Sequence, residues 1–276
     1  MGFRIATNVQ SLAAQRTLSL QKGEQNKSLE KLASGERIVR AADDAAGLAI
    51  SEKFKGEIRS TRQSQRNSQD AVSLVQVAEG GLNEVGNMLI RMLELSIQGA
   101  TDTISDTERG FIDQEVQNLK GEVERIAKTT KFGNVALLSG EGEALEFQVG
   151  TGSAESSRIK FDPAQFNALL ENMGISDVAT TTKQLSQENL DKIDGAIDRV
   201  SGQRASFGAM QNRLQSTINN LMISDENLSA ANSRIRDADI AQETSELTKR
   251  NILTQAGVST LAQANSNTQL ALRLIG

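Results

Sequence analysis

A heptad ladder near the C-terminal end of the chain constrains the fold more than any other feature. Apolar residues recur at every seventh position, and further seam positions lie between them. This four-three alternation is typical of a coiled-coil helix, which over residues 193–235 would extend for roughly 64 Å. A helix of that length predicts a rod, and its narrow seam predicts packing against several other helices. The ladder residues are Ile193, Val200, Phe207, Leu214, Leu221, Leu228 and Ile235.

Four of the seam positions between the ladder residues carry polar side chains, namely Arg204, Gln211, Asp225 and Asn232. Polar residues in a coiled-coil seam specify the register of the helices and lower their stability. We therefore expect these four residues to fix the register and to face solvent or a third helix.

The complete absence of His and Cys from the 276 residues excludes several classes of function. Without these residues the chain can form no Cys/His zinc site, no Ser-His-Asp triad, no thiol nucleophile and no disulfide. Enzymes that use only carboxylates, Lys or Ser remain formally open. We expect a protein that is not an enzyme and that binds no metal and no cofactor.

Charge and hydropathy argue against two further kinds of partner. The formal net charge is −5 and aromatic residues make up 3% of the chain, whereas nucleic-acid binding needs clustered Lys and Arg or stacked aromatic rings. No stretch approaches about 18 consecutive apolar residues, so we expect no membrane-spanning helix. The first residues also lack the basic and apolar regions of a cleaved secretory signal.

The first half of the chain shows the signals of three successive helices. Asp43 or Asp44 can cap the second of them, because a carboxylate there accepts hydrogen bonds from unpaired backbone N–H groups. Ser105 and Glu108 form a capping box at the start of the third, and Gly99 marks an end. The predicted helices cover residues 5–33, 44–98 and 105–130.

The middle of the chain differs in character from both ends. Residues 145–149 and 158–161 alternate with period two around a Gly/Ser-rich connection, which predicts a β-hairpin. Pro163, the single proline, suits the first turn of a short helix through Leu170. The ladder helix then begins at about residue 186.

A break is expected at residues 237–239, where a charged cluster from Arg234 to Asp239 can close a bend with salt bridges. The last helix has an alternating seam of its own and a second apolar face, so it needs more than one partner helix. Its predicted seam residues are Leu247, Asn251, Thr254, Val258, Leu261, Asn265, Thr268, Leu272 and Ile275.

Several long motifs, in matching order at both ends, resemble the bacterial flagellin family. One is Ser-Leu-Glu-Lys-Leu-Ala-Ser-Gly and the next Ala-Ala-Asp-Asp-Ala-Ala-Gly-Leu-Ala-Ile-Ser-Glu. The resemblance covers roughly residues 1–140 and 190–276. Its motifs are residues 28–35, 41–52, 66–70, 76–80, 211–214, 226–228, 233–239, 251–253, 255–256 and 261–265.

The resemblance implies a mainly α fold, a long antiparallel helical rod or coiled-coil bundle with a small central β-hairpin. Residues 1–42 and 237–276 would form paired inner helices with a connecting segment. Residues 43–236 would form the helical wall, with the hairpin near 145–161. Only about 50 residues separate the two matching regions, so the large variable outer domains that many flagellins carry are expected to be missing.

The resemblance also implies a function. Such a chain would be a structural subunit that polymerises with its own copies into the flagellar filament for motility. It would be exported unfolded by the type III apparatus with an export chaperone, and added at the distal tip beneath the cap proteins. It would thus be extracellular, with junction proteins as further partners. The expected polymerisation residues are Ile5, Val9, Leu12, Leu247, Val258, Leu261, Leu272 and Ile275.

Two other functions stay open at this point. A hook–filament junction protein shares the terminal helices, although it normally carries extra central domains. A soluble coiled-coil adaptor would explain the seams without any polymer. The short middle and the complete wall-helix motifs favour flagellin.

Some flagellins are recognised by an animal innate immune receptor through a surface on the central helices. The sequence departs from this pattern at Leu93, where the family often has Arg, and loss of that donor is expected to weaken recognition. A second departure, Gly133-Asn134 where Asn-Gly is usual, is expected to change only a turn. The matching receptor positions are Arg91, Glu94, Leu95, Gln98 and Glu115.

Overall fold

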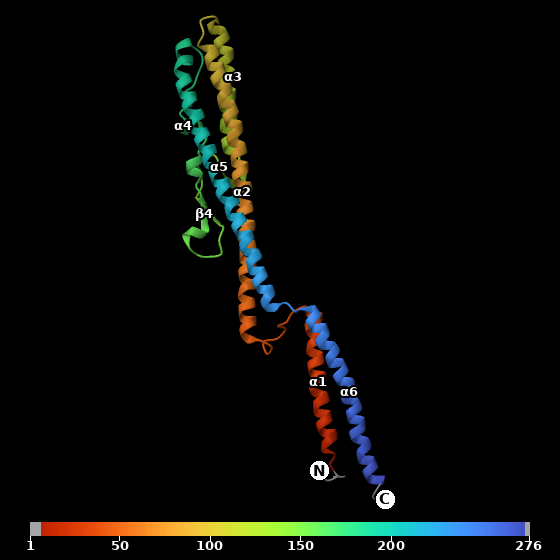
Figure 1. The fold of residues 1–276 in the computed structure, drawn as a ribbon. Helices are drawn as coiled ribbons and strands as arrows, with labels where there is room; N and C mark the ends of the chain where they lie inside the picture. Colours follow the sequence, from red (N-terminus) through yellow and green to blue (C-terminus); the bar gives the residue numbers. More distant parts are fainter. Residues whose placement is uncertain (1–6, 274–276) are drawn as a thin grey trace. The chain divides into compact units, whose positions relative to one another are not determined.

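The computed structural model describes the backbone of residues 7–273 and the side chains of residues 7–267. The fold is 76% helical, with long helices and two small antiparallel strand pairs, so the predicted mainly α class is confirmed (Figure 1). The elements are α1 (Val9–Ser34), α2 (Ala45–Gly99), α3 (Asp106–Thr129), β1 (Lys131–Phe132), β2 (Val135–Ala136), β3 (Leu145–Gln148), η1 (Glu155–Ser157), β4 (Arg158–Phe161), η2 (Pro163–Phe166), α4 (Leu170–Met173), α5 (Lys183–Arg236) and α6 (Ile240–Arg273).

The chain divides into two compact units, whose boundaries fall inside α2 and α5. The larger unit is Arg59–Asp225, and the smaller one combines the described residues up to Ile58 with those from Glu226 onward. The larger unit therefore holds α3, both strand pairs and most of α2 and α5. The smaller unit holds α1, α6 and the remaining turns of α2 and α5.

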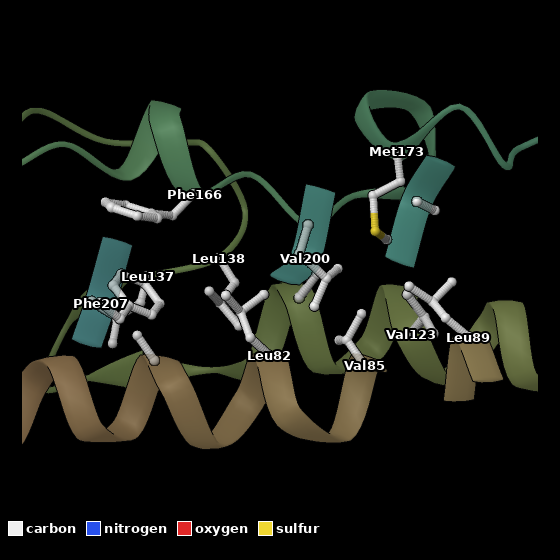
Figure 2. Close-up of a cluster of buried hydrophobic side chains, with 14 of the residues drawn as sticks. Leu82, Val85, Leu89, Val123, Leu137, Leu138, Phe166, Met173, Val200 and Phe207 are labelled. Atoms are coloured by element: carbon white, nitrogen blue, oxygen red, sulfur yellow. The ribbon is translucent and has the colours of Figure 1, made fainter. Parts of the chain in front are cut away.

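In the larger unit α2, α3 and α5 lie side by side, with α2 antiparallel to the other two (Figure 1). Side-chain contacts between residues far apart in the sequence join these helices. Arg91 pairs with Glu115 at 2.9 Å, and Gln211 donates to Glu79 at 2.6 Å. Apolar side chains from the three helices and from the segments after α3 meet between them (Figure 2). The labelled members are Leu82, Val85, Leu89, Val123, Leu137, Leu138, Phe166, Met173, Val200 and Phe207.

The heptad ladder of α5 is buried over its first half. Ile193, Val200, Phe207 and Leu214 are at most 3% exposed and belong to the core. The other three, Leu221, Leu228 and Ile235, are half-buried. A long helix buries its seam fully only where several elements cover it, as the narrow ladder predicts.

Three of the four polar seam positions of α5 pair with α2, and Arg204 is exposed. This agrees with their predicted role in fixing the register, because each pair holds one α5 position against one α2 position. The pairs are Gln211 with Glu79 (2.6 Å), Asp225 with Arg62 (3.1 Å) and Asn232 with Ser51 (2.9 Å).

The predicted helix caps are present. Ser105 N donates to Glu108 Oε2 at 2.7 Å and Glu108 N donates back to Ser105 Oγ at 3.4 Å, which completes the capping box of α3. Of the two candidate carboxylates before α2, Asp44 is the cap, because its Oδ1 accepts from Gly47 N at 2.8 Å. Asp43 instead accepts from Arg40 N at 3.0 Å.

The predicted hairpin is confirmed as β3 and β4, paired from Leu145–Phe161 to Gln148–Arg158. The prediction of a single short helix from Pro163 to Leu170 is wrong, because two short helices, η2 and α4, form instead. Asn167 separates them, since its Oδ1 accepts from Leu169 N at 2.9 Å and competes with helical hydrogen bonding.

Sequence reasoning missed one strand pair, β1 with β2. The two-residue loop Gly133-Asn134 joins these strands, and Gly133 has a φ of +59°, a conformation that glycine adopts without strain. This is the loop where the sequence has Gly133-Asn134 in place of the family's usual Asn-Gly, a difference that we expect to change only the turn. The strand pair could have been predicted, because a two-residue loop of Gly and Asn is typical of a tight hairpin.

Candidate assembly surface

The terminal helices α1 and α6 lie side by side and antiparallel in the smaller unit (Figure 1). Asn8 caps α1, its side chain accepting from Ser11 N at 3.0 Å, and Gly35 ends the helix with a φ of +70°. Asp239 caps α6 and accepts from Ala241 N at 2.9 Å. Local sequence thus sets where each helix begins, and packing between the helices has to hold them together.

The segments that follow α1 and precede α6 are joined by backbone pairing. Arg37 N donates to Arg236 O at 2.6 Å, and Ala238 N donates to Gly35 O at 2.9 Å. The Arg236 guanidinium forms ion pairs with Glu36, at 2.9 Å, and with Glu52. The break predicted at residues 237–239 and its closure by salt bridges are therefore confirmed.

The faces that α1 and α6 turn toward each other are mostly small or polar. Each face repeats at alternating steps of three and four, and all of its members are buried or half-buried. Only four of the fourteen positions are large apolar residues. The α1 face is Ser11, Ala14, Leu18, Gln21, Gln25, Ser28 and Leu32, and the α6 face is Glu243, Leu247, Arg250, Thr254, Gly257, Leu261 and Ala264.

Polar side chains bridge the two helices along this face. Gln25 Nε2 donates to Asn251 Oδ1 at 2.5 Å, and Ser11 Oγ donates to Asn265 Oδ1 at 2.9 Å. The remaining bridges are Asn8 Nδ2 to Ala264 O (3.0 Å) and Arg250 to Gln21 (3.4 Å) and to Glu24 (3.9 Å). Sequence reasoning placed Asn251 and Asn265 on the seam of the last helix but missed their polar partners on α1, because it followed apolar residues there, whereas the three-four spacing of α1 is carried mainly by Ser, Ala and Gln.

Large apolar side chains of the same two helices face solvent. Large aliphatic side chains exposed together on a protein surface mark an interaction site, and we refer to those of α1 and α6 as the exposed row. Its members are Val9 (63% exposed), Leu12 (57%), Leu20 (65%) and Leu29 (48%) on α1, and Ile240 (51%), Ile252 (61%), Leu253 (42%) and Val258 (52%) on α6.

The predicted seam of α6 is wrong by one residue at Val258, which is exposed and whose place Gly257 takes. Asn265, also expected on the seam, contacts α1 through the hydrogen bond from Ser11, although it is exposed beside the buried Ala264. A Cβ added at Gly257 would come within 3.3 Å of Leu18 Cδ1, so the small residue lets the helices approach closely.

The expected polymerisation residues fall into three groups. Val9, Leu12 and Val258 are exposed. Leu247 and Leu261 are half-buried against α1. Ile5 and Ile275 lie outside the described residues, and Leu272 lies where only the backbone is described.

A groove on the α1–α6 pair lies beside the exposed row. Its volume is about 500 Å³, and its lining is mainly apolar. It is formed by Ala13, Ala14 and Thr17 of α1 and by Gly257, Thr260 and Ala264 of α6, among others.

The expected receptor positions lie on α2 and α3 of the larger unit. Arg91 pairs with Glu94 at 3.0 Å and with Glu115 at 2.9 Å, and these hydrogen bonds raise the pKa of Arg91 above its usual value. Gln98 is also exposed. Leu95 is only 2% exposed and belongs to the core, so its assignment to a surface is wrong.

Within residues 7–273, no group of three or more acidic side chains is arranged to hold a metal ion. Over the same described part of the chain, no helix is both long and apolar enough to cross a membrane.

Comparisons with known proteins give a consistent family. Residues 5–143 match the bacterial flagellin N-terminal helical region, and residues 190–275 match the C-terminal helical region. Between them, residues 144–189 carry the β3–β4 hairpin and no variable outer domain.

Relatives match over nearly their full lengths. A flagellin of Halalkalibacterium halodurans is 42% identical over 97% of this chain and 98% of its own length. A flagellin of Bacillus subtilis is 40% identical over 99% and 100%, and flagellin FlaB1 of Treponema pallidum is 38% identical over 97% and 98%.

Solved structures agree with these relatives. Bacillus cereus flagellin superposes with a TM-score of 0.50 at 29% identity, over 60% of this chain and 94% of the other. A protein described as flagellar hook-associated, from Vibrio parahaemolyticus, reaches 0.58 at 14% identity over 71% and 100%, which shows a shared fold alone. On the family matches and the near-complete relatives, the chain belongs to the bacterial flagellin family, whose members are structural proteins.

Proposed function

We propose that this chain is the structural subunit of a bacterial flagellar filament and polymerises through the exposed apolar side chains of α1 and α6. The exposed row carries the proposal. Among the described side chains, eight large aliphatic ones face solvent on two helices whose mutual contact is mostly small and polar. Two helices with this exposed apolar surface are suited to pack against other copies of the same chain.

A comparison of the free energy gained by burying these side chains with the cost of ordering the backbone favours folding of the two helices on assembly. Burying a Val, Leu or Ile side chain is worth about 1.5–3 kcal/mol, so covering the eight roughly half-exposed ones yields on the order of 10 kcal/mol per subunit. Ordering the backbone costs about 1–2 kcal/mol per residue. The polar contact between α1 and α6 offsets little of that cost. Both ends should therefore be disordered in the monomer and gain order on assembly. A protease digest of monomer that leaves both ends intact would contradict this.

The domain roles follow from the resemblance. Residues 1–42 and 237–276 would line the inside of the filament, and residues 43–236 would form its wall. Export in an unfolded state by the type III apparatus with a chaperone, and addition at the distal tip under the cap, would place the protein outside the cell, next to junction proteins. A weakly folded terminal pair suits passage through a narrow channel.

The alternative of a hook–filament junction protein has less support. The likeness to the hook-associated protein is one of fold alone, whereas relatives matched over nearly their full lengths are named flagellins.

Receptor recognition is proposed for a smaller surface than the sequence suggested. Arg91, Glu94, Gln98 and Glu115 remain available on it, and the donors of Arg91 are already engaged by two carboxylates. We expect weaker recognition than in relatives with Arg in place of Leu93. Leu93→Arg should strengthen the signal in a receptor reporter assay, and an unchanged signal would remove this surface from the proposal.

The polymerisation proposal can be tested with paired charge substitutions. Leu12→Asp with Ile252→Asp should abolish filaments, because each charge would have to be buried without a partner. Asn26→Asp with Gln255→Asp places the same charges at exposed polar positions of the same helices and should leave filaments intact. Leu261→Asp and Leu272→Asp should also block assembly while the larger unit stays folded.

Electron microscopy after induced polymerisation gives the readout, and circular dichroism of the monomer checks the fold. Ordered filaments from the Leu12→Asp, Ile252→Asp protein would overturn the assignment of the surface. Absence of filaments from the unmodified chain would overturn the function itself.

A further inference from the structure

A connection without regular secondary structure lies between α4 and α5 in the larger unit, and we refer to residues 174–182 as the strap. In Figure 1 it is the thin trace that leads from α4 to the start of α5. Ile175 and Val178 are fully buried and belong to the core, whereas the two residues between them are exposed. The strap therefore covers part of the core with two apolar side chains three residues apart.

Side chains of α3 hold the strap by its backbone. Lys120 Nζ donates to Ser176 O at 2.6 Å and to Val178 O at 3.0 Å. Asp113 Oδ1 accepts from Thr180 N at 2.7 Å. Each of these bonds satisfies a backbone group of the strap that has no partner in a helix or a sheet.

Two further side chains complete the attachment of the strap. Asn189 Nδ2 on α5 donates to Ala179 O at 2.7 Å, and Gln117 Nε2 on α3 donates to Val178 O at 3.2 Å. Between residues 176 and 180, no backbone hydrogen bond joins the strap to α3 or α5 in the described part of the chain. A segment held in this way can detach without breaking a helical hydrogen bond.

The Lys120 amine is a costly anchor. Lys120 is 8% exposed, and its amine donates to neutral carbonyl groups. Burial lowers the pKa of Lys120 below its usual 10.5, although the charges of Asp113 and Asp177 act in the opposite direction. The closed strap therefore keeps a cation out of water, and opening removes that cost.

We propose that the strap opens and closes as a unit on an intact helix bundle, and that opening uncovers the apolar surface beneath Ile175 and Val178. Two apolar side chains and four side-chain anchors hold the strap, whereas α2, α3 and α5 share a continuous apolar core. Segments with few buried apolar contacts open at a lower free energy than the core does. The strap is thus a conformational device of the single subunit, and it does not depend on polymerisation.

The absence of cysteine from the sequence allows one introduced thiol to report opening. Val178→Cys places the thiol on the strap, and Val85→Cys places it on α2 as the matched control. Both valines are fully buried, and cysteine behaves as a small apolar residue when buried. The measurement is the rate at which each full-length protein reacts with excess disulfide reagent, at several urea concentrations below the unfolding transition. Circular dichroism checks that each variant is folded.

The strap thiol should react at least about tenfold faster than the α2 thiol, and its rate should depend more weakly on urea, because local opening exposes less surface than unfolding. Adding Asn189→Ala to Val178→Cys removes one anchor and should raise the rate of the strap thiol roughly tenfold. Asn220→Ala makes the same change at an exposed position of α5 and should leave the rate unchanged.

Equal rates and equal urea dependence of the two thiols would overturn the proposal, because the strap would then open only when the whole unit unfolds. A strap thiol that Asn189→Ala does not accelerate, or that Asn220→Ala accelerates equally, would also overturn it. Filament formation plays no part in these measurements, so failure of the strap proposal and failure of the proposed function are separate results.

Discussion

Gln25 on α1 donates its side-chain amide to Asn251 Oδ1 on α6, with 2.5 Å between the nitrogen and the oxygen. Gln25 lies on the face that α1 turns toward α6, Asn251 lies at the edge of the facing surface of α6, and both are half-buried. The pair shows how weakly the chain supports its own terminal helices. Two leucines at these positions would bury more apolar surface between the helices than the Gln25 and Asn251 side chains do.

Replacing one amide of this pair should cost more than replacing both. Gln25→Leu alone leaves Asn251 without its bridge, which should destabilise the α1–α6 contact by about 1–3 kcal/mol. Gln25→Leu with Asn251→Leu should be neutral or stabilising, because no polar group is left unpaired. Hydrogen exchange of the α1 and α6 backbone amides in assembled protein is measured for wild type, each single variant and the double variant, which together form a double-mutant cycle. Additive effects of the two single changes would contradict the prediction.

Arg236 should be the main side-chain support of the connection between α1 and α6. Its side chain is 13% exposed and pairs with Glu36 and Glu52. Arg236→Ala removes the cation that pairs with Glu36 and one of the cations near Glu52, and should lower the local stability of residues 35–44 by about 1–3 kcal/mol. Arg234→Ala removes an exposed arginine two residues away and serves as control. Exchange mass spectrometry of this segment is the measurement, and equal effects of both changes would count against it.

The adjacent glycines of α2 should respond to alanine in opposite directions. A Cβ at Gly80 meets nothing within 4 Å, so Gly80→Ala should stabilise the larger unit by about 0.5–1 kcal/mol through helix propensity. A Cβ at Gly81 would lie 2.8 Å from Leu138 Cδ1 and 2.9 Å from Thr130 Oγ1. The steric cost of the added methyl group then exceeds the gain from the higher helix propensity of alanine, so Gly81→Ala should lower the stability of the larger unit by about 1 kcal/mol.

Urea denaturation of the full-length chain compares the two variants at adjacent positions of the same helix. Because both substitutions are identical in chemistry, the sign of each shift isolates the packing. A stabilising effect of Gly81→Ala would show that α3 and the segment after it pack less closely on α2 than described.

The capping box of α3 should make part of the stability depend on pH. Hydrogen bonds from the backbone N–H and hydroxyl of Ser105 lower the pKa of Glu108 below its usual 4.5. A carboxyl whose pKa is lowered in the folded state binds its proton more weakly there than in the unfolded chain. Its contribution is therefore present above pH 4.5 and disappears as the pH falls through the lowered value.

Glu108→Gln should consequently lower the denaturation midpoint at neutral pH and leave it unchanged in strong acid. Glu143→Gln, at an exposed carboxylate away from any helix start, supplies the control. Urea midpoints of the three proteins across the acid range are the measurement. A difference between wild type and Glu108→Gln that persists undiminished at the lowest pH would contradict the assigned cause.

Features set by neighbouring residues could be predicted from the sequence. The Ser105–Glu108 box, the end of α2 at Gly99, the break at 237–239 and the four-three ladder of α5 each depend on a few adjacent residues or on one helical period. The alternation that predicted β3 and β4 is of the same kind. For these elements the backbone follows local hydrogen bonding and periodicity, and packing adds to what is already specified.

Only the tertiary structure decided which side of each terminal helix is inside. Apolar identity pointed to Val258, whereas Gly257 takes the seam because a small residue allows Leu18 to approach within contact. Leu95, expected at a surface, is buried because α2 is covered on that side by the core. Burial depends on partners far away in the sequence, and a helical period is compatible with more than one inward face. The sequence by itself therefore determined where the helices run. Packing determined that mostly small and polar side chains lie between α1 and α6, and that large apolar side chains of the same helices face solvent.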